Sequence, residues 1–410
     1  MSRSLDSLRR LVAEYPRQFW LLFAGMLISA VGGSMVWPFL TIIVRQRLDI
    51  PLTTIGLLLA LHSASALVTT LIAGPVADRF GRKGVMVFSL FTSALIYVAM
   101  SQASSLPAWA LLMVANGALN PLFRVGSDAM VADLLPPEQR AGAFALIRMS
   151  NNVGVAIGPA VGGFLAAVSY DWAFFAAAVA SVAFGLLVLF LVTETMPAQE
   201  EAQGEDNSSG GYGHLLRDRR FVAFCAVTTL AIVPSALVFV LLPVYGKEQY
   251  GVVESQYGFV MATNAAMVVL FQYPVTKGTE RFAPLPVMGA GALFYALGVG
   301  SIALGTGFGH FLLSLVVLTI GEMLLVPTGT TLAANLSPPD MRGRYMGFYG
   351  LTWRVGIGLG PVLGGFLNDQ IGPVAIWYGG LVAGLAASLG YLILGWLVRR
   401  RGIDSQPQIS

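Results

Sequence analysis

Long apolar runs and short polar breaks alternate along almost the whole chain. The runs are about 20 residues long or longer, enough to cross about 30 Å of hydrocarbon as helices that rise about 1.5 Å per residue. Twelve such runs predict an all-α membrane protein with twelve transmembrane helices. The predicted spans are 19–44, 55–77, 85–103, 108–134, 142–168, 172–194, 221–246, 256–277, 285–305, 310–336, 344–368 and 374–398.

The second half of the chain repeats the first. The stretch from Pro136 to Leu165 recurs 202 residues later, from Pro338 to Leu367. A parallel repeat of about half the length, in a chain this apolar, is typical of transporters built from two similar helical bundles. We therefore expect an N-terminal six-helix bundle over 1–194, a C-terminal six-helix bundle over 219–410, and between them a cytoplasmic linker over 195–218. The linker is acidic and rich in Ser and Gly, so it is predicted to lack a fold.

Charge adds an orientation to this picture. Only 11% of the residues are charged, and the mean hydropathy is +0.73, whereas a soluble domain carries roughly 25% charge. With the amino terminus inside, the cytoplasmic segments hold eighteen of the 24 Lys and Arg residues and the outer turns hold three. Both termini are therefore predicted to be cytoplasmic, in the cell membrane (bacterial inner or plasma membrane). The net charge of +3 reflects this topology and predicts no nucleic-acid partner.

Several functions are disfavoured by what the sequence lacks. Cys225 is the only cysteine, so no disulfide and no zinc or haem ligand pattern can form within the chain. No Gly-x-x-x-x-Gly-Lys loop is present, and the three histidines lack a nucleophile elbow. We expect no metal, no cofactor and no enzymatic activity. A gradient is the expected energy source, and the expected partners are a small-molecule substrate, protons and the lipid bilayer, with the protein working as a monomer.

The polar loop between the second and third predicted spans carries a specific motif. It reads Gly-Pro-Val-Ala-Asp-Arg-Phe-Gly-Arg-Lys-Gly from Gly74 to Gly84. This resembles the cytoplasmic signature of the major facilitator superfamily, a family of twelve-helix transporters. The resemblance implies a conformational latch, in which a glycine allows close helix approach, Asp78 faces a helix amino terminus, and arginines supply pairing cations. The gating residues predicted in this loop are Gly74, Asp78, Arg79, Gly81 and Arg82.

The fifth predicted span carries a second motif, Gly154-xxx-Gly158-Pro159-xx-Gly162-Gly163. It resembles the antiporter signature of the drug:proton branch of the same superfamily, which implies export. Small residues four apart also let helices pack closely, and a proline removes one backbone hydrogen bond. Packing and antiport are compatible, so Gly158 and Pro159 are predicted to act in gating. The same pattern recurs from Gly356 to Gly365.

Ionisable residues within spans are the strongest candidates for function. Each costs at least about 2.5 kcal/mol at the centre of a membrane. Asp128 and Arg124 lie four residues apart on the fourth span, and Glu322 lies in the middle of the tenth. Arg124 resembles the arginine of the family's proton-transfer signature, although Asp128 stands where that signature commonly has Gly. Carboxylates on the fourth and tenth spans are similar to those of a lactococcal multidrug:proton antiporter.

These three residues are the predicted proton-coupling site, at which a proton and a lipophilic cation would compete for Asp128 and Glu322 in one central cavity. A structural ion pair of Asp128 with Arg124 or Arg148, or of Glu322 with Arg354, is the other interpretation. Polar and aromatic side chains would complete the substrate site through hydrogen bonds and cation–π attraction, although helix packing would explain them equally. The predicted substrate-binding residues are Glu322, Asp128, Asn116, Asn120, Trp37, Phe123, Phe239, Phe271 and Trp353.

Three functions fit these observations. The first is proton-coupled export of lipophilic, cationic, drug-like compounds by alternating access. The second is proton-coupled or facilitated transport of another solute, such as a sugar or glycolipid, because a fold does not fix a function. The third, a membrane sensor that transports nothing, is disfavoured because no large soluble signalling domain is evident.

Overall fold

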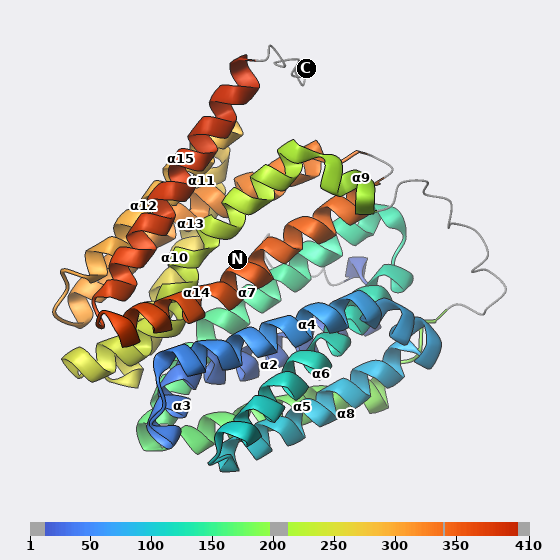
Figure 1. Ribbon diagram of the computed structural model, residues 1–410. Helices are drawn as coiled ribbons and strands as arrows, with labels where there is room; N and C mark the ends of the chain where they lie inside the picture. Colours follow the sequence, from blue (N-terminus) through green and yellow to red (C-terminus); the bar gives the residue numbers. More distant parts are fainter. Residues whose placement is uncertain (1–12, 197–211, 339–340, 401–410) are drawn as a thin grey trace, which may run out of the picture. The chain divides into compact units, whose positions relative to one another are not determined.

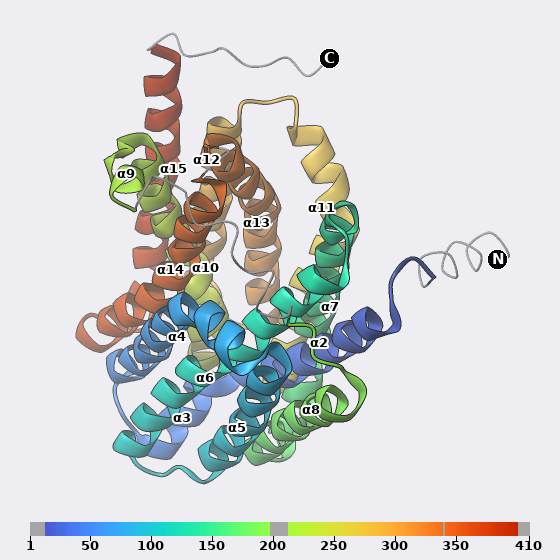
Figure 2. The same ribbon diagram turned by 90° about the vertical axis from the view of Figure 1, so that its right-hand side faces the viewer.

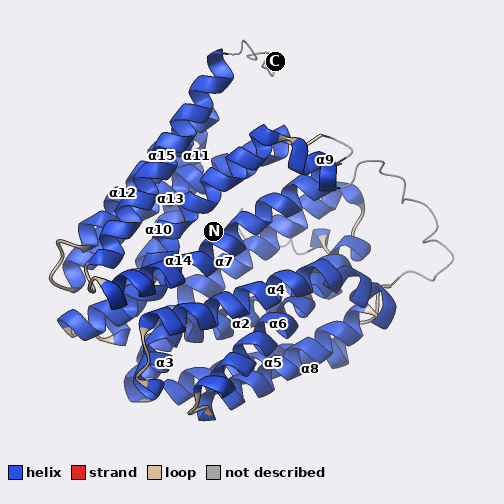
Figure 3. Ribbon diagram, in the orientation of Figure 1, coloured by secondary structure: helices blue, strands red, loops and turns tan. Residues whose placement is uncertain are grey.

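The computed structural model describes residues 13–196, 212–338 and 341–400, and its regular elements in these ranges are all helices (Figure 3). In the first half the elements are α2 (Arg17–Val36), η1 (Trp37–Phe39), α3 (Leu40–Leu48), α4 (Leu52–Phe80), α5 (Arg82–Gln102), α6 (Leu106–Leu134), α7 (Pro137–Val168) and α8 (Tyr170–Leu191). The later elements are α9 (Tyr212–Arg217), α10 (Arg219–Tyr250), α11 (Glu254–Thr279), α12 (Pro284–Ile302), α13 (Phe308–Leu336), α14 (Arg342–Gln370) and α15 (Ala375–Arg400). Figure 1 labels the α-helices along the chain.

The predicted all-α membrane fold is confirmed. Eleven segments of the described chain are long and apolar enough to cross a membrane, with α2, η1 and α3 together forming the first. The remaining predicted span, 344–368, corresponds to α14, which has 29 residues but is less apolar because it contains charged residues and many glycines. Most of the predicted linker lies outside the described residues. Within its described part, α9 corrects the expectation that the linker has no fold.

Helix ends follow local sequence signals. Ser169 accepts a hydrogen bond from the N–H of Asp171 at the start of α8, and Asp218 caps α10 in the same way. Gly251 ends α10 at a φ of 64°, in the left-handed conformation that glycine adopts without strain. The predicted span 172–194 ends earlier than expected, at Leu191, and the residues that follow form a polar segment.

The chain divides into two compact units that do not coincide with its sequence halves. The first unit comprises Met1–Ile43, Leu61–Glu205 and Val253–Ala262, and the second comprises Val44–Ala60, Asp206–Val252 and Thr263–Ser410. Helices α4 and α11 therefore contribute to both units. In the first unit α2 packs on α7 and α8, and α5 packs on α6 and α8, as both views show (Figures 1 and 2). In the second, α10 packs on α14 and α15, and α12 packs on α13 and α15.

Small residues of the antiporter-like motif bring α7 against α2. A Cβ atom added to Gly158 would lie 2.7 Å from the carbonyl oxygen of Val31, so no side chain fits there without movement. The hydroxyl of Ser34 donates a 3.0 Å hydrogen bond to the carbonyl of Gly154 across the same interface. The close packing predicted from this motif is confirmed.

Pro159 lies within α7, and its carbonyl oxygen would be 2.8 Å from a Cβ atom added to Gly258 on α11. The second copy of the motif packs α14 on α10 in the equivalent way. A Cβ atom on Gly356 would lie 2.7 Å from the side chain of Ile232, and one on Gly360 would lie 2.7 Å from that of Ala236. The repeat seen in the sequence therefore reappears as equivalent helix contacts.

Candidate transport and gating sites

Glu322 belongs to a polar cluster inside the second unit. It lies near the middle of α13 and is half-buried. The side-chain amide of Asn264, on α11, donates hydrogen bonds of 2.8 Å to Oε2 of Glu322 and 2.9 Å to the hydroxyl of Thr319. A carboxylate offers more acceptor positions than this one donor uses, so a proton or a cationic group can still be bound. Asn264, which is not among the substrate-binding residues predicted from the sequence, is thus a direct partner of the best candidate residue.

Asp128 and Arg124 lie one turn apart on α6, in the first unit. Asp128 is half-buried and Arg124 is exposed. Arg124 supplies the positive charge that acts on Asp128, yet within the described chain no ion pair joins Asp128 to Arg124 or to the exposed Arg148. The direct ion pair considered from the sequence is therefore not formed. Asp128 is in the first unit and Glu322 is in the second, and their access to one cavity stays a prediction.

Asn116 and Trp37 meet at His62 on the first unit's part of α4. The imidazole Nε2 lies 3.1 Å from Oδ1 of Asn116, and its ring centroid lies 5.0 Å from that of Trp37. Asn116 is buried. Asn120, one turn further along α6, is half-buried. These contacts place Asn116 and Trp37 around one polar group, and their role in substrate binding stays a prediction.

The other predicted aromatic residues have different surroundings. Phe123 belongs to the core cluster of the first unit, where its ring packs edge-on against Phe184 with centroids 6.0 Å apart. Phe271 is half-exposed on α11, whereas Phe239 on α10 and Trp353 on α14 are half-buried. Phe123 therefore packs in the core, which favours a structural role for it over a role in the substrate wall.

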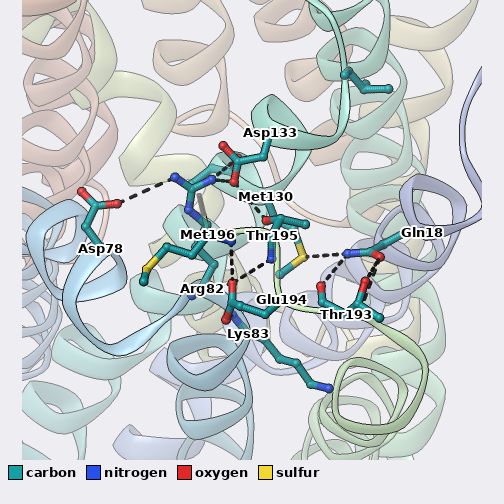
Figure 4. Close-up of polar contacts among 12 residues, drawn as sticks. Gln18, Asp78, Arg82, Lys83, Met130, Asp133, Thr193, Glu194, Thr195 and Met196 are labelled. Carbon is teal, nitrogen blue, oxygen red and sulfur yellow. Dashed lines mark hydrogen bonds and ion pairs between the residues drawn. The ribbon is translucent and has the colours of Figure 1, made fainter. Parts of the chain in front are cut away.

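Arg82 is the centre of a polar cluster at the predicted cytoplasmic end of the first unit (Figure 4). Its guanidinium pairs with Asp133 at the end of α6 and donates a 3.1 Å hydrogen bond to the carbonyl of Ala129. The carboxylate of Asp78, at the end of α4, lies 3.8 Å away. One arginine thus links the ends of α4 and α6 to the start of α5. We call Asp78, Arg82, Asp133, Glu194 and Thr195 the cytoplasmic cluster.

Glu194 supplies a contact that sequence reasoning missed. Its carboxylate accepts hydrogen bonds from the backbone N–H groups of Arg82 and Lys83, at 3.2 and 2.9 Å, and so caps the amino terminus of α5. Gly81, just before this helix, has a φ of 83°, and a Cβ atom there would lie 2.7 Å from Oε2 of Glu194. The backbone conformation therefore favours glycine at 81, and a Cβ atom there would also displace the carboxylate of Glu194. The hydroxyl of Thr195 donates a 3.0 Å hydrogen bond to Asp133.

The cytoplasmic cluster corrects three details of the predicted latch. The anion at a helix amino terminus is Glu194, whereas Asp78 is exposed beside Arg82. The guanidinium of Arg79 lies over the ring of Phe80, 5.6 Å from its centroid, rather than in a described ion pair. A Cβ atom on Gly74 would meet no described atom within 4 Å, so the described residues show no close approach at this glycine.

At the predicted outer end of α14, in the second unit, lies a contact that the sequence motifs did not indicate. Asp369, at the end of α14, accepts hydrogen bonds from the hydroxyl of Thr53 at 2.6 Å and from the backbone N–H groups of Thr53 and Leu52 at 2.8 and 3.3 Å. It thus caps the amino terminus of α4. Partial burial raises the pKa of Asp369, but the hydrogen bonds from Thr53, Asn368 and Leu52 together outweigh burial and lower its pKa below the usual value.

The equivalent position in the first unit is closed by different chemistry. The phenol of Tyr170, at the start of α8, donates a hydrogen bond to the carboxylate of Glu254, at the start of α11. A Cβ atom on Gly163 would lie 2.7 Å from the carbonyl oxygen of Glu254. We call the Asp369 contact with α4 and the Tyr170 contact with Glu254 the outer-end contacts.

Taken together, long apolar helices, a twofold repeat, intramembrane carboxylates and polar contacts at helix ends define a multi-pass membrane transporter. A family model described as Major Facilitator Superfamily matches residues 22–253 and 235–408. The chain therefore belongs to the Major Facilitator Superfamily, as its motifs indicated.

Relatives whose sequences are about one-quarter identical to this chain carry different functional names. The MFS-type transporter YhjO of Bacillus subtilis (strain 168) is 25% identical over 94% of this chain and 95% of its own. A Na(+), Li(+), K(+)/H(+) antiporter of Planococcus maritimus is 27% identical over 90% of this chain and 92% of its own. The multidrug resistance protein MdtH of Shigella boydii serotype 4 (strain Sb227) is 27% identical over 92% and 93%, respectively.

Solved structures agree on the fold. The nucleoside transporter NupG superimposes with a TM-score of 0.76 at 16% identity, covering 95% of this chain and 100% of that chain. A POT family transporter in complex with 5-aminolevulinic acid gives a TM-score of 0.78 at 16% identity, covering 95% and 97%. At these identities the likeness shows the shared fold alone.

Proposed function

We propose that this transporter exports lipophilic, cationic, drug-like compounds in exchange for protons by alternating access. The observation that carries the proposal is Glu322, a carboxylate in the middle of a membrane-spanning helix whose described polar partner is the neutral amide of Asn264. An uncompensated charge at that depth is costly, so neutralisation by a proton or by a cation is favourable. The relatives named for multidrug resistance and for cation/proton antiport support the same chemistry.

Competition between a proton and the cationic substrate for the carboxylate of Glu322 couples the movement of one to the movement of the other. A proton on Glu322 removes the negative charge that attracts a cationic substrate, and a bound cation removes the charge that attracts the proton. Asp128 supplies a second carboxylate on α6, with the exposed Arg124 one turn away. Because each ligand displaces the other, protons that enter down their gradient drive the cation out.

The polar contacts at the helix ends provide the gates in this proposal. The cytoplasmic cluster holds the ends of α4, α5 and α6 together through Arg82, Asp133 and Glu194. The outer-end contacts hold α4 to α14 and α8 to α11. Alternating access requires the outer-end contacts to break when the pathway opens outward.

The test is transport by the purified protein in proteoliposomes with an imposed pH gradient. A cationic dye, a neutral drug, a sugar and sodium ions are compared as substrates. Wild-type protein should move the dye only with the gradient, and Glu322→Gln should abolish this movement. Glu280→Gln, which removes an exposed carboxylate, is the matched control and should transport normally. Dye movement that ignores the gradient, or that persists in Glu322→Gln, would refute the proposal.

The alternative is transport of another solute on the same fold, such as a sugar or glycolipid. It predicts gradient-dependent or facilitated sugar movement and no dye movement in the same assay. Sodium movement without dye movement would instead match the activity named for the Planococcus maritimus relative.

A further inference from the structure

An apolar pocket with a basic rim lies in the second unit, away from the carboxylate sites. Its volume is about 270 Å³, and it is formed where α10, α12, α13 and α15 meet. Phe224, Leu285, Leu332 and Leu394 line its apolar wall. All four helices reach it with the ends that are predicted to be cytoplasmic. Figure 2 shows these helices gathered in one part of the second unit.

Two arginines complete the rim. Arg220, in the first turn of α10, and Arg399, in the last turn of α15, both line the pocket and are exposed. No carboxylate in the described chain pairs with either guanidinium. The nearest acid along the chain, Asp218, instead accepts hydrogen bonds from the backbone N–H groups of Arg220 and Phe221. Two positively charged side chains therefore line this apolar pocket, and no described carboxylate neutralises either of them.

The depth of the rim in the membrane is indicated by Trp396. This residue lies on α15, one turn before Arg400, whose guanidinium lies 4.4 Å from the centroid of the indole ring. Tryptophan and snorkelling arginine gather at the membrane–water interface. We therefore expect the last turn of α15, and with it Arg399, to lie at the level of the lipid headgroups.

We propose that this pocket binds an anionic membrane phospholipid. The phosphate would sit between Arg220 and Arg399, and the upper part of one acyl chain would enter the apolar hollow. The volume is below the roughly 300 Å³ at which sites for whole drug-sized ligands begin, so it suits a segment of chain better than a transported compound. Basic pockets between transmembrane helices on the cytoplasmic side are suited to acidic lipid headgroups.

Lipid binding to the purified full-length protein tests the proposal. Native mass spectrometry would compare phosphatidylglycerol with phosphatidylethanolamine of identical acyl chains, and glycerol 3-phosphate would serve as a headgroup without chains. Wild-type protein should bind phosphatidylglycerol about tenfold more tightly than phosphatidylethanolamine. Arg220→Gln with Arg399→Gln should remove this preference. Leu394→Trp, which fills the hollow and keeps both arginines, should weaken binding of both lipids.

The control is Lys277→Gln with Arg281→Gln. It removes the same charge from the same end of the second unit, at exposed residues that do not line the pocket. The preference for phosphatidylglycerol should survive in this variant. An equal loss in the control would mean diffuse surface charge and would overturn the proposal. Effective competition by glycerol 3-phosphate would mean a site for soluble anions and would also overturn it.

Discussion

At the scale of single residues, Glu322 shows how a costly group is kept in an apolar helix. A carboxylate at the membrane centre costs about 2.5 to 3.5 kcal/mol, and a hydrogen bond to a charged group returns about 1.5 to 3 kcal/mol. The bond from Asn264 therefore offsets much of the cost without adding a charge. A neutral donor leaves the negative charge available to a proton or cation, whereas an arginine partner would have neutralised it permanently.

Replacing Asn264 tests this balance. Asn264→Leu removes the donor and should lower kcat/KM for gradient-driven dye transport about tenfold or more, because a charge-assisted hydrogen bond is lost. Gln272→Leu is the matched control: it also removes an amide of α11 that bonds to α13, but its acceptor is the backbone carbonyl of Met323. Transport kinetics in proteoliposomes measure both. Equal losses in the two variants would mean that Asn264 only holds the helices together.

The sequence identified some of these residues and not others, for a physical reason. Glu322 was predicted because an acid within an apolar run is visible in the sequence alone. Its partner Asn264 is 58 residues away, and Glu194 lies 112 residues from the N–H group of Arg82 that it caps. Such pairs depend on how helices rotate and pack, which apolar periodicity does not determine. Asp78 was therefore predicted to have the capping role that Glu194 has.

At the scale of helices, close approach decides which glycines are required. The interface of α2 and α7 has no room for a Cβ atom at Gly158, whereas Gly74 on α4 faces open space among the described residues. The two glycines look equally important in their sequence motifs. Their packing environments differ, so their substitutions should differ as well.

Alanine substitutions at Gly158 and Gly74 should therefore differ in their effect on the stability of the protein. Gly158→Ala should destabilise the protein by about 1 to 3 kcal/mol, because the added atom would overlap Ser34 and the carbonyl oxygen of Val31. Gly74→Ala should change stability by less than about 0.5 kcal/mol. Thermal unfolding of the purified variants in detergent measures the difference. Similar destabilisation by both would show that Gly74 is closely packed after all.

The contact between α14 and α4 should depend on pH in a defined direction. The pKa of Asp369 is lowered in the folded protein, so the cap is fully present above the ordinary carboxyl pKa of about 3.9 and is lost as the pH falls through the lowered value. Hydrogen exchange of the Leu52 and Thr53 N–H groups, corrected for intrinsic rates, should thus be equally slow at pH 7 and pH 5.

Asp369→Ala should speed this exchange about fivefold at pH 7, since loss of an N-cap costs about 1 kcal/mol. Gln370→Ala, which changes the next exposed residue of α14, should leave it unchanged. Protection that persists in Asp369→Ala would show that packing, and not the carboxylate, holds the amino terminus of α4.

At the scale of the whole molecule, the 202-residue repeat fixes which helices touch and leaves the polar groups free to differ. Gly163 meets Glu254, and the equivalent Gly365 meets Leu52. The polar contacts at these two helix interfaces are not equivalent. At the offset of 202 residues, Asp369 corresponds to Ala167 and Tyr170 corresponds to Gly372, neither of which can make the same hydrogen bond through its side chain. The equivalent helix packing in the two halves was predictable from the motif spacing. The two outer-end contacts were not, because each occurs in only one copy of the repeat.

If the outer-end contact of α4 and α14 opens in each cycle, a covalent bond there should stop transport. Thr53→Cys with Asp369→Cys places thiols where a 2.6 Å hydrogen bond joins the native side chains, in a background whose one native cysteine, Cys225, is buried. Oxidation should abolish dye transport in proteoliposomes, and a reducing agent should restore it.

The control pair is Ser301→Cys with Ser314→Cys, which joins α12 to α13 at a native 2.7 Å contact inside the second sequence half. Its oxidation should leave transport intact, because neighbouring helices of one bundle move together in alternating access. Full transport by the oxidised Thr53 and Asp369 variant would mean that the contact stays closed throughout the cycle and that the substrate leaves by another path.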